Sequence, residues 1–149
     1  MTDRVRAVLV TPSGALLTIK RVRPDAEPYW VLPGGGVEPT DASLEDALAR
    51  EIHEELAGQA RVHSLIHVEE IRGESQYFFL ARIDHWDPTR RSGPEFTDPT
   101  RGAYIVEEIP LTSSALAGTA LKPESVGDLL VRHASDLFHL ADLRTSRPA

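Results

Sequence analysis

The stretch LPGGGVEPTDASLEDALAREIHEEL (Leu32–Leu56) joins a glycine triplet to a helix with an acidic end. Ser43 is a favourable N-cap for this helix, and Asp46 follows three residues later as a weaker form of the capping box. Gly58 is expected to end the helix as its left-handed cap. Apolar residues recur at helical spacing after the cap and predict a buried stripe, made of Leu44, Ala47, Leu48, Ile52 and Leu56.

Three glutamates of this helix, Glu51, Glu54 and Glu55, are called the glutamate arc below, because they lie within about 100° of one another at 3.6 residues per turn. Like charges one turn apart repel by about 0.2–0.5 kcal/mol per pair, so a compensating positive charge is expected. The chain contains no cysteine, which leaves oxygen ligands and favours a hard ion, Mg²⁺ or Mn²⁺. Because magnesium is commonly shared with substrate phosphates, the arc predicts an ion together with a phosphate-bearing ligand. A merely solvated acidic face is the alternative.

The residues around the glycine triplet suggest how such a ligand is held. Gly34–Gly36 is expected to form a turn whose backbone approaches the ion or the phosphates closely, because no Cβ intrudes. Lys20–Arg23 forms a basic patch at the end of a predicted strand, and Arg21 and Arg23 are the candidates for gripping a phosphate. Tyr29 is a candidate for stacking on a flat base, whereas the neighbouring Trp30 is favoured as a core residue.

The whole chain has the properties of one globular domain. It has 149 residues, of which 41% are hydrophobic and 26% charged, so we expect a single domain over 1–149 with a frayed tail over about 143–149. A net charge of −7 disfavours binding to a nucleic acid backbone. The longest wholly apolar stretch, Tyr77–Ala81, is too short to span a membrane. The absence of cysteine is compatible with the cytoplasm, which is the expected location.

The predicted elements alternate between strands and helices. A second amphipathic helix is expected to open at Pro123, with an apolar stripe that continues to Leu140. The predicted strands are Val5–Thr11, Ala15–Val22, Tyr29–Leu32, Arg61–Glu70, Gln76–Ile83 and Ala103–Ile109. This order predicts an α/β (α+β) fold, an α/β/α sandwich in which a mixed β-sheet carries a helix on each face.

The segment GGGVEPTDASLEDALAREIHEELAG resembles the signature of the Nudix hydrolases. That signature reads Gly, five residues, Glu, seven residues, then Arg-Glu-aliphatic-any-Glu-Glu-any-Gly-aliphatic. From Gly36, the spacing to Arg50–Glu55 agrees with it, and the preceding WVLPGG also fits the family's layout. The resemblance implies a Nudix-type sandwich and a pyrophosphohydrolase, in which water attacks a phosphorus of a nucleoside diphosphate linked to another group.

The resemblance also implies roles for particular residues. The glutamate arc and the Gly36 carbonyl would bind divalent metals, with Gly35 as an alternative contact and a close-approach position for the substrate. Arg50 would orient the glutamates by salt bridges. The family often takes a further acidic residue from a late loop as base or extra ligand. Glu95 is the candidate favoured for that role over Asp98, and a merely solvated carboxylate stays open.

Two positions depart from the signature. Its first glutamate falls on Ala42, and Asp41 takes that place only if the loop is one residue longer than usual. Its last glycine falls on Ala57, one residue before Gly58. These departures keep open an alternative function, a catalytically weak or inactive Nudix-like module that binds nucleotides or regulates a partner. The expected partner is a small-molecule nucleotide, and homodimerisation stays open because dimers are common in the family.

Overall fold

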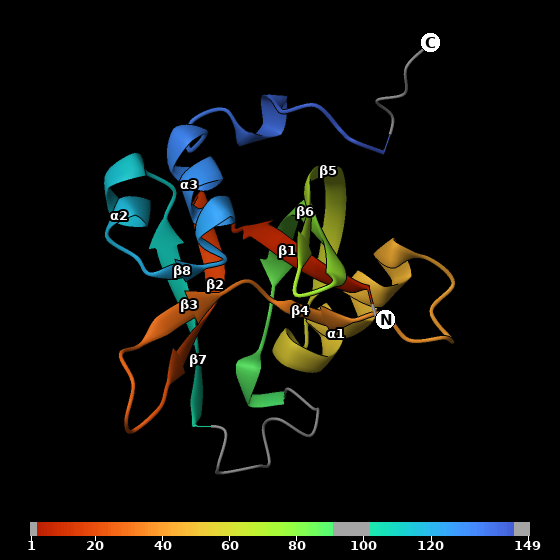
Figure 1. Cartoon of the computed structure of the whole chain (residues 1–149), viewed down its shortest axis with the longest axis horizontal. Coiled ribbons are helices and arrows are strands. Elements are labelled where there is room, and N and C mark those ends of the chain that lie inside the picture. The colour runs from red at the N-terminus through yellow and green to blue at the C-terminus, as the bar shows by residue number, and fades with distance from the viewer. Residues whose placement is uncertain (1–2, 91–101, 145–149) are drawn as a thin grey trace.

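A computed structural model describes residues 3–90 and 102–144 (Figure 1). Within these ranges the strands and helices follow one another as β1 (Arg4–Val10), β2 (Ala15–Val22), β3 (Tyr29–Val31), β4 (Gly34–Gly36), α1 (Leu44–Leu56), β5 (Gln59–Ile71), β6 (Glu74–His85), η1 (Pro88–Arg90), β7 (Ala103–Pro110), α2 (Ser113–Ala117), β8 (Leu121–Lys122), α3 (Glu124–Arg132) and η4 (Leu137–His139). No helix in the described part of the chain is long and apolar enough to cross a membrane.

The strands form one mixed sheet, as predicted. Its main order is β5-β6-β1-β2-β3-β8, with β4 paired to β1 and β7 paired to β2. The β1–β6 and β3–β8 pairs are parallel and the others antiparallel. The first half of β1 (Arg4–Arg6) pairs with β4, whereas its end (Leu9 and Val10) pairs with β2. The two long strands β1 and β2 therefore diverge, and β4 occupies the place that β2 vacates.

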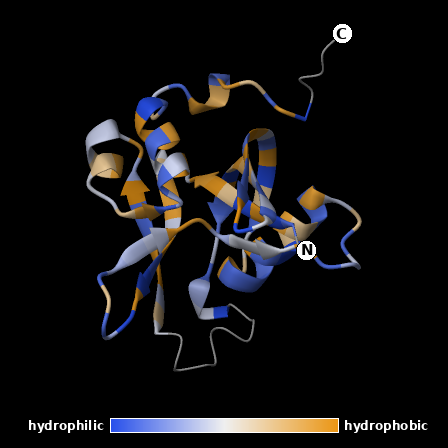
Figure 2. Cartoon of the chain, in the orientation of Figure 1, coloured by the Kyte–Doolittle hydropathy of each residue, from blue (hydrophilic) through white to orange (hydrophobic). Residues whose placement is uncertain are grey.

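Each face of the sheet packs against its own helices, which confirms the predicted sandwich. Val5, Ala7 and Leu9 of β1 pack on the α1 side together with the apolar stripe of that helix. Val8 and Val10 pack on the other side, with α2, α3 and η4. Figure 1 shows α1 (yellow) apart from α2 and α3 (cyan and blue), and in Figure 2 hydrophobic colour marks the central strands. Successive side chains of β1 thus point to opposite faces of the sheet and contribute to the hydrophobic core on each face.

The second predicted helix is shorter than its apolar stripe. The α-helix ends at Arg132, because His133 leaves helical geometry (φ −118°, ψ 21°) and its ring nitrogen lies 3.0 Å from the Asp136 carboxylate. Leu137 still reaches the core through the separate 3₁₀ turn η4. The short helix α2 was not predicted at all. Five residues are too few for a periodic pattern to stand out from a loop.

The segment after η4 returns to α1 rather than fraying at once. Leu143 donates its backbone N–H to the Leu65 carbonyl at 2.8 Å, and Asp142 accepts from the Leu65 N–H at 3.1 Å. Arg144 donates to Glu45 in the first turn of α1 at 3.1 Å and to the His63 carbonyl at 3.1 Å. Residues 142–144 therefore tie β5 to the start of α1, and the prediction of fraying from residue 143 is wrong for Leu143 and Arg144.

Candidate active site

The glycine triplet forms the strand β4, not the expected turn. Gly34, Gly35 and Gly36 pair in register with Arg6, Val5 and Arg4 of β1. At Gly34 the backbone has φ +150°, and a Cβ there would collide with the Val5 carbonyl. At Gly35 a Cβ would lie 2.6 Å from the carboxylate of Glu51. The glycines thus allow the backbone to pass between β1 and the acidic helix.

The glutamate arc lies against this strand at three depths. Ser43 caps the helix as predicted, by accepting the Asp46 N–H at 3.0 Å, and this fixes the helix phase. Glu55 is buried and accepts the Gly34 N–H at 2.6 Å. The exposed fraction of the side chain rises from 12% at Glu51 to 35% at Glu54. The arc therefore runs from the buried strand outward to solvent.

Arg50 is held in place by Asp41. The guanidinium donates from Nε (3.1 Å) and from Nη2 (2.9 Å) to the two Asp41 oxygens, a bidentate pair. Asp41 also accepts the Glu38 N–H at 2.8 Å. These bonds, the one from Arg50 first, hold the pKa of the Asp41 carboxyl below its usual range, and Asp41 in turn raises the pKa of Arg50. Asp41 thus binds Arg50, while the neighbouring Ala42, at the position of the first signature glutamate, is exposed.

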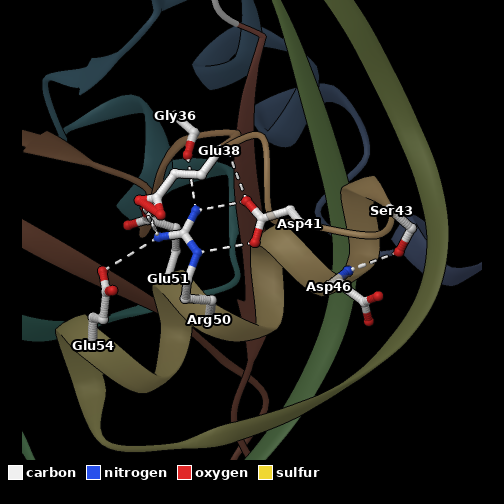
Figure 3. A network of polar contacts seen from close by, with 8 residues as sticks. All are labelled: Gly36, Glu38, Asp41, Ser43, Asp46, Arg50, Glu51 and Glu54. Carbon is white, nitrogen blue, oxygen red and sulfur yellow. Dashed lines mark hydrogen bonds and ion pairs between the residues drawn. The ribbon is translucent and has the colours of Figure 1, made fainter.

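The rest of the Arg50 guanidinium faces the acidic helix and β4 (Figure 3). Nη2 also donates to the Gly36 carbonyl at 3.0 Å. Nη1 lies 3.0 Å from Glu51, 3.4 Å from Glu38 and 3.5 Å from Glu54. One guanidinium therefore faces three carboxylates. The negative charge left uncompensated there would attract a cation.

The oxygen ligands offered by the glutamate arc suit a hard divalent ion. Their side chains are nevertheless not arranged as a preformed metal site. Over residues 3–90 and 102–144, no three Asp, Glu or His side chains are arranged as a metal-binding group. The reason is that Arg50 forms ion pairs with Glu51 and Glu54, while Glu55 accepts a hydrogen bond from Gly34 of β4. All the candidate ligand atoms are oxygens, and the absent Cβ of Gly35 lets the Glu51 carboxylate lie against the backbone. An ion would compete with Arg50 for the same oxygens.

The end of the helix corrects the prediction for Gly58. Ala57, not Gly58, adopts the left-handed conformation (φ 48°), and its N–H bonds to the His53 carbonyl. Gly58 is needed for space instead, because a Cβ there would lie 2.8 Å from the His85 carbonyl of β6. The left-handed residue therefore falls where the Nudix signature has its glycine, and the helix is not extended.

The basic residues proposed to bind substrate are brought together. Arg21, Arg23 and Tyr29 line one cavity of about 820 Å³. The guanidinium of Arg21 lies 3.8 Å from the centre of the Tyr104 ring. Trp30 packs partly buried against the α3-side core, in agreement with its expected core role. Glu95 and Asp98 lie outside the described residues.

Sequence reasoning missed Arg4 and Arg6, which line the same cavity. They alternate with buried Val5 and Ala7 on β1. This pattern is typical of the solvent-exposed face of a strand and does not by itself predict a binding role. Arg6 donates to the Leu32 carbonyl at 3.3 Å. Burial lowers the pKa of the Arg6 guanidinium, and the Glu55 carboxylate nearby opposes that shift. Arg6 also pairs with Gly34, whose N–H binds Glu55, so Arg6 adjoins both the cavity and the glutamate arc.

Comparisons with known proteins identify the family to which the chain belongs. The NUDIX domain family model matches residues 1–110. No curated protein matches the chain. Among solved structures, the E. coli ORF135 protein is 26% identical, with a TM-score of 0.58 over 100% of this chain and 94% of its own. An ADP-ribose pyrophosphatase from Streptococcus suis is 17% identical, with a TM-score of 0.65 over 95% and 96%.

An Ap4A hydrolase from C. elegans is also similar in fold, at 17% identity and a TM-score of 0.64 over 89% of this chain and 96% of its own. The family match spans most of the chain and includes both the glycine strand and the acidic helix. The chain therefore belongs to the Nudix family and is a Nudix-type hydrolase.

Proposed function

We propose that this protein cleaves a phosphoanhydride bond in a nucleoside diphosphate linked to another group, by attack of water on phosphorus. The observation that carries the proposal is the Arg50 guanidinium placed among Glu38, Glu51 and Glu54 beside the glycine strand. This constellation concentrates negative charge at one spot, beside a strand whose glycines let a carboxylate approach the backbone closely. A solvated acidic face has no need of either property.

Family membership supports a divalent metal, Mg²⁺ or Mn²⁺, held by the glutamate arc and the Gly36 carbonyl. When bound, such an ion neutralises phosphate charge and lowers the pKa of bound water. Arg50 orients Glu51 and Glu54, because one guanidinium contacts both. Gly35 lets the Glu51 carboxylate lie against the backbone. Glu95 stays the candidate for the general base.

The substrate would reach this centre from the basic cavity. Arg21 and Arg23 offer charge-assisted hydrogen bonds to phosphate oxygens, and Tyr29 offers an aromatic face to a base. Arg6 lines the cavity and pairs with Gly34, which binds Glu55, so a phosphate bound by Arg6 would lie near the acidic helix. We infer a nucleotide derivative as substrate, and a simple phosphate monoester would use few of these contacts.

Phosphate release from a panel of nucleotide derivatives tests the proposal. We expect turnover with Mg²⁺ or Mn²⁺ and none after chelation, with Glu54→Gln reducing turnover by at least about 100-fold. Glu108→Gln is the matched control, because Glu108 is an exposed glutamate of β7 and its replacement should leave turnover unchanged. Near wild-type turnover in Glu54→Gln would contradict the site. Metal-independent binding of nucleotides without turnover would favour the alternative, a binding or regulatory module.

Three further expectations remain predictions. Cytoplasmic location rests on the lack of cysteine in the sequence. Homodimerisation rests on the family alone, and sedimentation would decide it. Lack of affinity for nucleic acid rests on the net charge of −7, and competition with RNA would test it.

A further inference from the structure

The basic cavity carries more positive charge than a single scissile phosphoanhydride requires. Its described lining contains six cationic side chains against one carboxylate, Glu74, in a chain whose net charge is −7. The cations come from four separate places in the chain: the start of β1, the end of β2, the β5–β6 turn and β8. They are Arg4, Arg6, Arg21, Arg23, Arg72 and Lys122.

These cations fall into an inner and an outer tier. Arg4, Arg6 and Arg21 are half-buried, and we call them the inner cations. Arg23, Arg72 and Lys122 are exposed, and we call them the rim cations. Arg23 follows the last residue of β2, Arg72 lies in the β5–β6 turn, and Lys122 ends β8. The rim cations are thus exposed residues of the lining that come from three different parts of the chain.

The inner cations already have neighbours in the protein. Arg4 pairs with Glu74 at 3.1 Å, and Arg6 donates to the Leu32 carbonyl. The Arg21 guanidinium lies over the Tyr104 ring. This tier adjoins the glutamate arc through Arg6 and is placed to meet the anhydride itself.

The rim cations are less well compensated. Lys122 lies 3.4 Å from Glu124, whose side chain is 82% exposed, so that pair is weak. Arg23 and Arg72 form no ion pair with any residue of 3–90 or 102–144. Three exposed cations on the lining of one cavity together favour an anionic ligand. A neutral base and ribose would offer these cations no opposite charge.

We infer that the substrate carries a second phosphate group, separate from the scissile anhydride, and that the rim cations bind it. This inference rests on the proposed function and deepens it. Phosphate suits the rim because the guanidinium groups of Arg23 and Arg72 offer planar forks of donors, the Lys122 ammonium adds a positive charge with three donors, and phosphate offers several acceptor oxygens. The cavity volume of about 820 Å³ is within the range for small-molecule sites, and Tyr29, Val31 and Pro123 supply its apolar wall.

Calorimetric binding of two probes in EDTA tests the inference without metal or turnover. Adenosine 3′,5′-bisphosphate should bind the wild type about tenfold or more tightly than adenosine 5′-monophosphate, since a charge-assisted hydrogen bond outweighs a neutral one. Arg72→Gln and Lys122→Gln should each reduce this ratio, and the double variant should bring it close to one. Circular dichroism verifies that the variants are folded, and both positions are exposed.

Arg61→Gln is the matched control, because Arg61 is an exposed cation paired with Asp84 outside this cavity. It removes the same net charge and should leave the probe ratio unchanged. Equal affinity of the two probes in the wild type would overturn the inference, as would an equal loss in Arg61→Gln. Stronger competition by a 5′-triphosphorylated RNA than by the bisphosphate would overturn the assignment to a small molecule.

The same experiments separate this inference from the proposed function. A retained bisphosphate preference without turnover on any nucleotide with Mg²⁺ would overturn the hydrolytic function and support the rim as a phosphate site. Turnover on nucleotide derivatives with no bisphosphate preference would overturn the rim site and support the hydrolytic function.

Discussion

Gly35 shows how one absent methyl group arranges the centre. A Cβ at this position would lie 2.6 Å from the Glu51 carboxylate, which is the far end of a flexible side chain. Gly35→Ala should therefore leave the free energy of unfolding nearly unchanged, while displacing Glu51 and reducing turnover on the order of 100-fold. Urea unfolding and phosphate release measure the two effects.

Gly118→Ala is the control for that variant, because its Cβ would meet nothing closer than 3.6 Å. It should leave turnover at the wild-type level. Full activity in Gly35→Ala would show that the close approach of Glu51 to the backbone has no part in the reaction.

Asp41 is expected to give the protein a pH-dependent contribution to stability. The bond from Arg50 lowers the pKa of the folded-state carboxyl, so the ionised form stabilises the fold above the unfolded-state pKa of about 4. This contribution is lost as the pH falls through the folded-state pKa. Asp41→Asn should thus lower the melting temperature at pH 7, and the gap to the wild type should narrow below about pH 4.

Thermal unfolding across this pH range checks the prediction for Asp41. Asp128→Asn, which changes an exposed carboxylate of α3, is the control and should track the wild type throughout. A gap of constant size at every pH would mean that Asp41 acts through packing and not through its charge.

At the scale of elements, two neighbouring substitutions at the end of α1 should change the free energy of unfolding in opposite directions. Ala57 pays for its left-handed conformation with steric strain, so Ala57→Gly should stabilise the protein by up to about 1 kcal/mol. Gly58→Ala should destabilise it by about 1–3 kcal/mol, because the new Cβ meets the His85 carbonyl at 2.8 Å. Urea denaturation followed by circular dichroism measures both. Destabilisation by Ala57→Gly would contradict the observed helix end.

The helix α1 as a whole should report metal binding through stability. An ion that binds only the folded state adds about 2.7 kcal/mol at 100 times its dissociation constant. Titration with Mn²⁺ should therefore raise the melting temperature of the wild type and leave Glu54→Gln nearly unshifted. Potassium chloride at equal ionic strength is the control for a general salt effect. Equal shifts in both proteins would place the ion elsewhere.

The elements were predictable where a local pattern determines the structure. Ser43 and the apolar stripe define the start and the buried face of α1, because capping and helical periodicity act within a few residues. The glycine triplet was misread as a turn, since its strand conformation depends on pairing with β1, about 30 residues earlier in the chain. The same holds for Gly58, whose necessity comes from the approach of β6 rather than from helix capping.

At the scale of the molecule, the net charge and the charge of the cavity have opposite signs. If the basic cavity governs binding of an anionic nucleotide, added salt should screen an attraction and raise the Michaelis constant. If the net charge of −7 governs it, salt should screen a repulsion and lower that constant. We expect the rise between 0.1 and about 1 M salt, where the Debye length falls from about 10 to about 3 Å.

Steady-state kinetics at saturating Mg²⁺, with potassium and tetramethylammonium chloride compared, checks this expectation. Agreement between the two salts excludes binding of a particular cation as the cause. A Michaelis constant that falls with both salts would show that the cavity does not steer the substrate.

The candidate site was predictable only in part, because some of its residues are close in sequence and others come together only in the folded chain. The glutamate arc and Arg50 are close in sequence, so their proximity follows from one helix. Arg4, Arg6 and Arg72 come close to Arg21 only because β1 pairs with β2 and with β6, which begins after the β5–β6 turn. No single segment contains that basic surface, and the average charge of the chain conceals it.

The contacts of residues 142–144 also bear on how the protein is made. Leu65 and Glu45 emerge from the ribosome long before their partners Leu143 and Arg144, since the Glu45–Arg144 pair spans 99 positions. During synthesis, the acidic helix can form and cap itself at Ser43, but its first turn stays untethered until translation passes residue 144. A nascent chain halted at residue 140 should therefore expose that turn to protease, and the released chain of 149 residues should protect it.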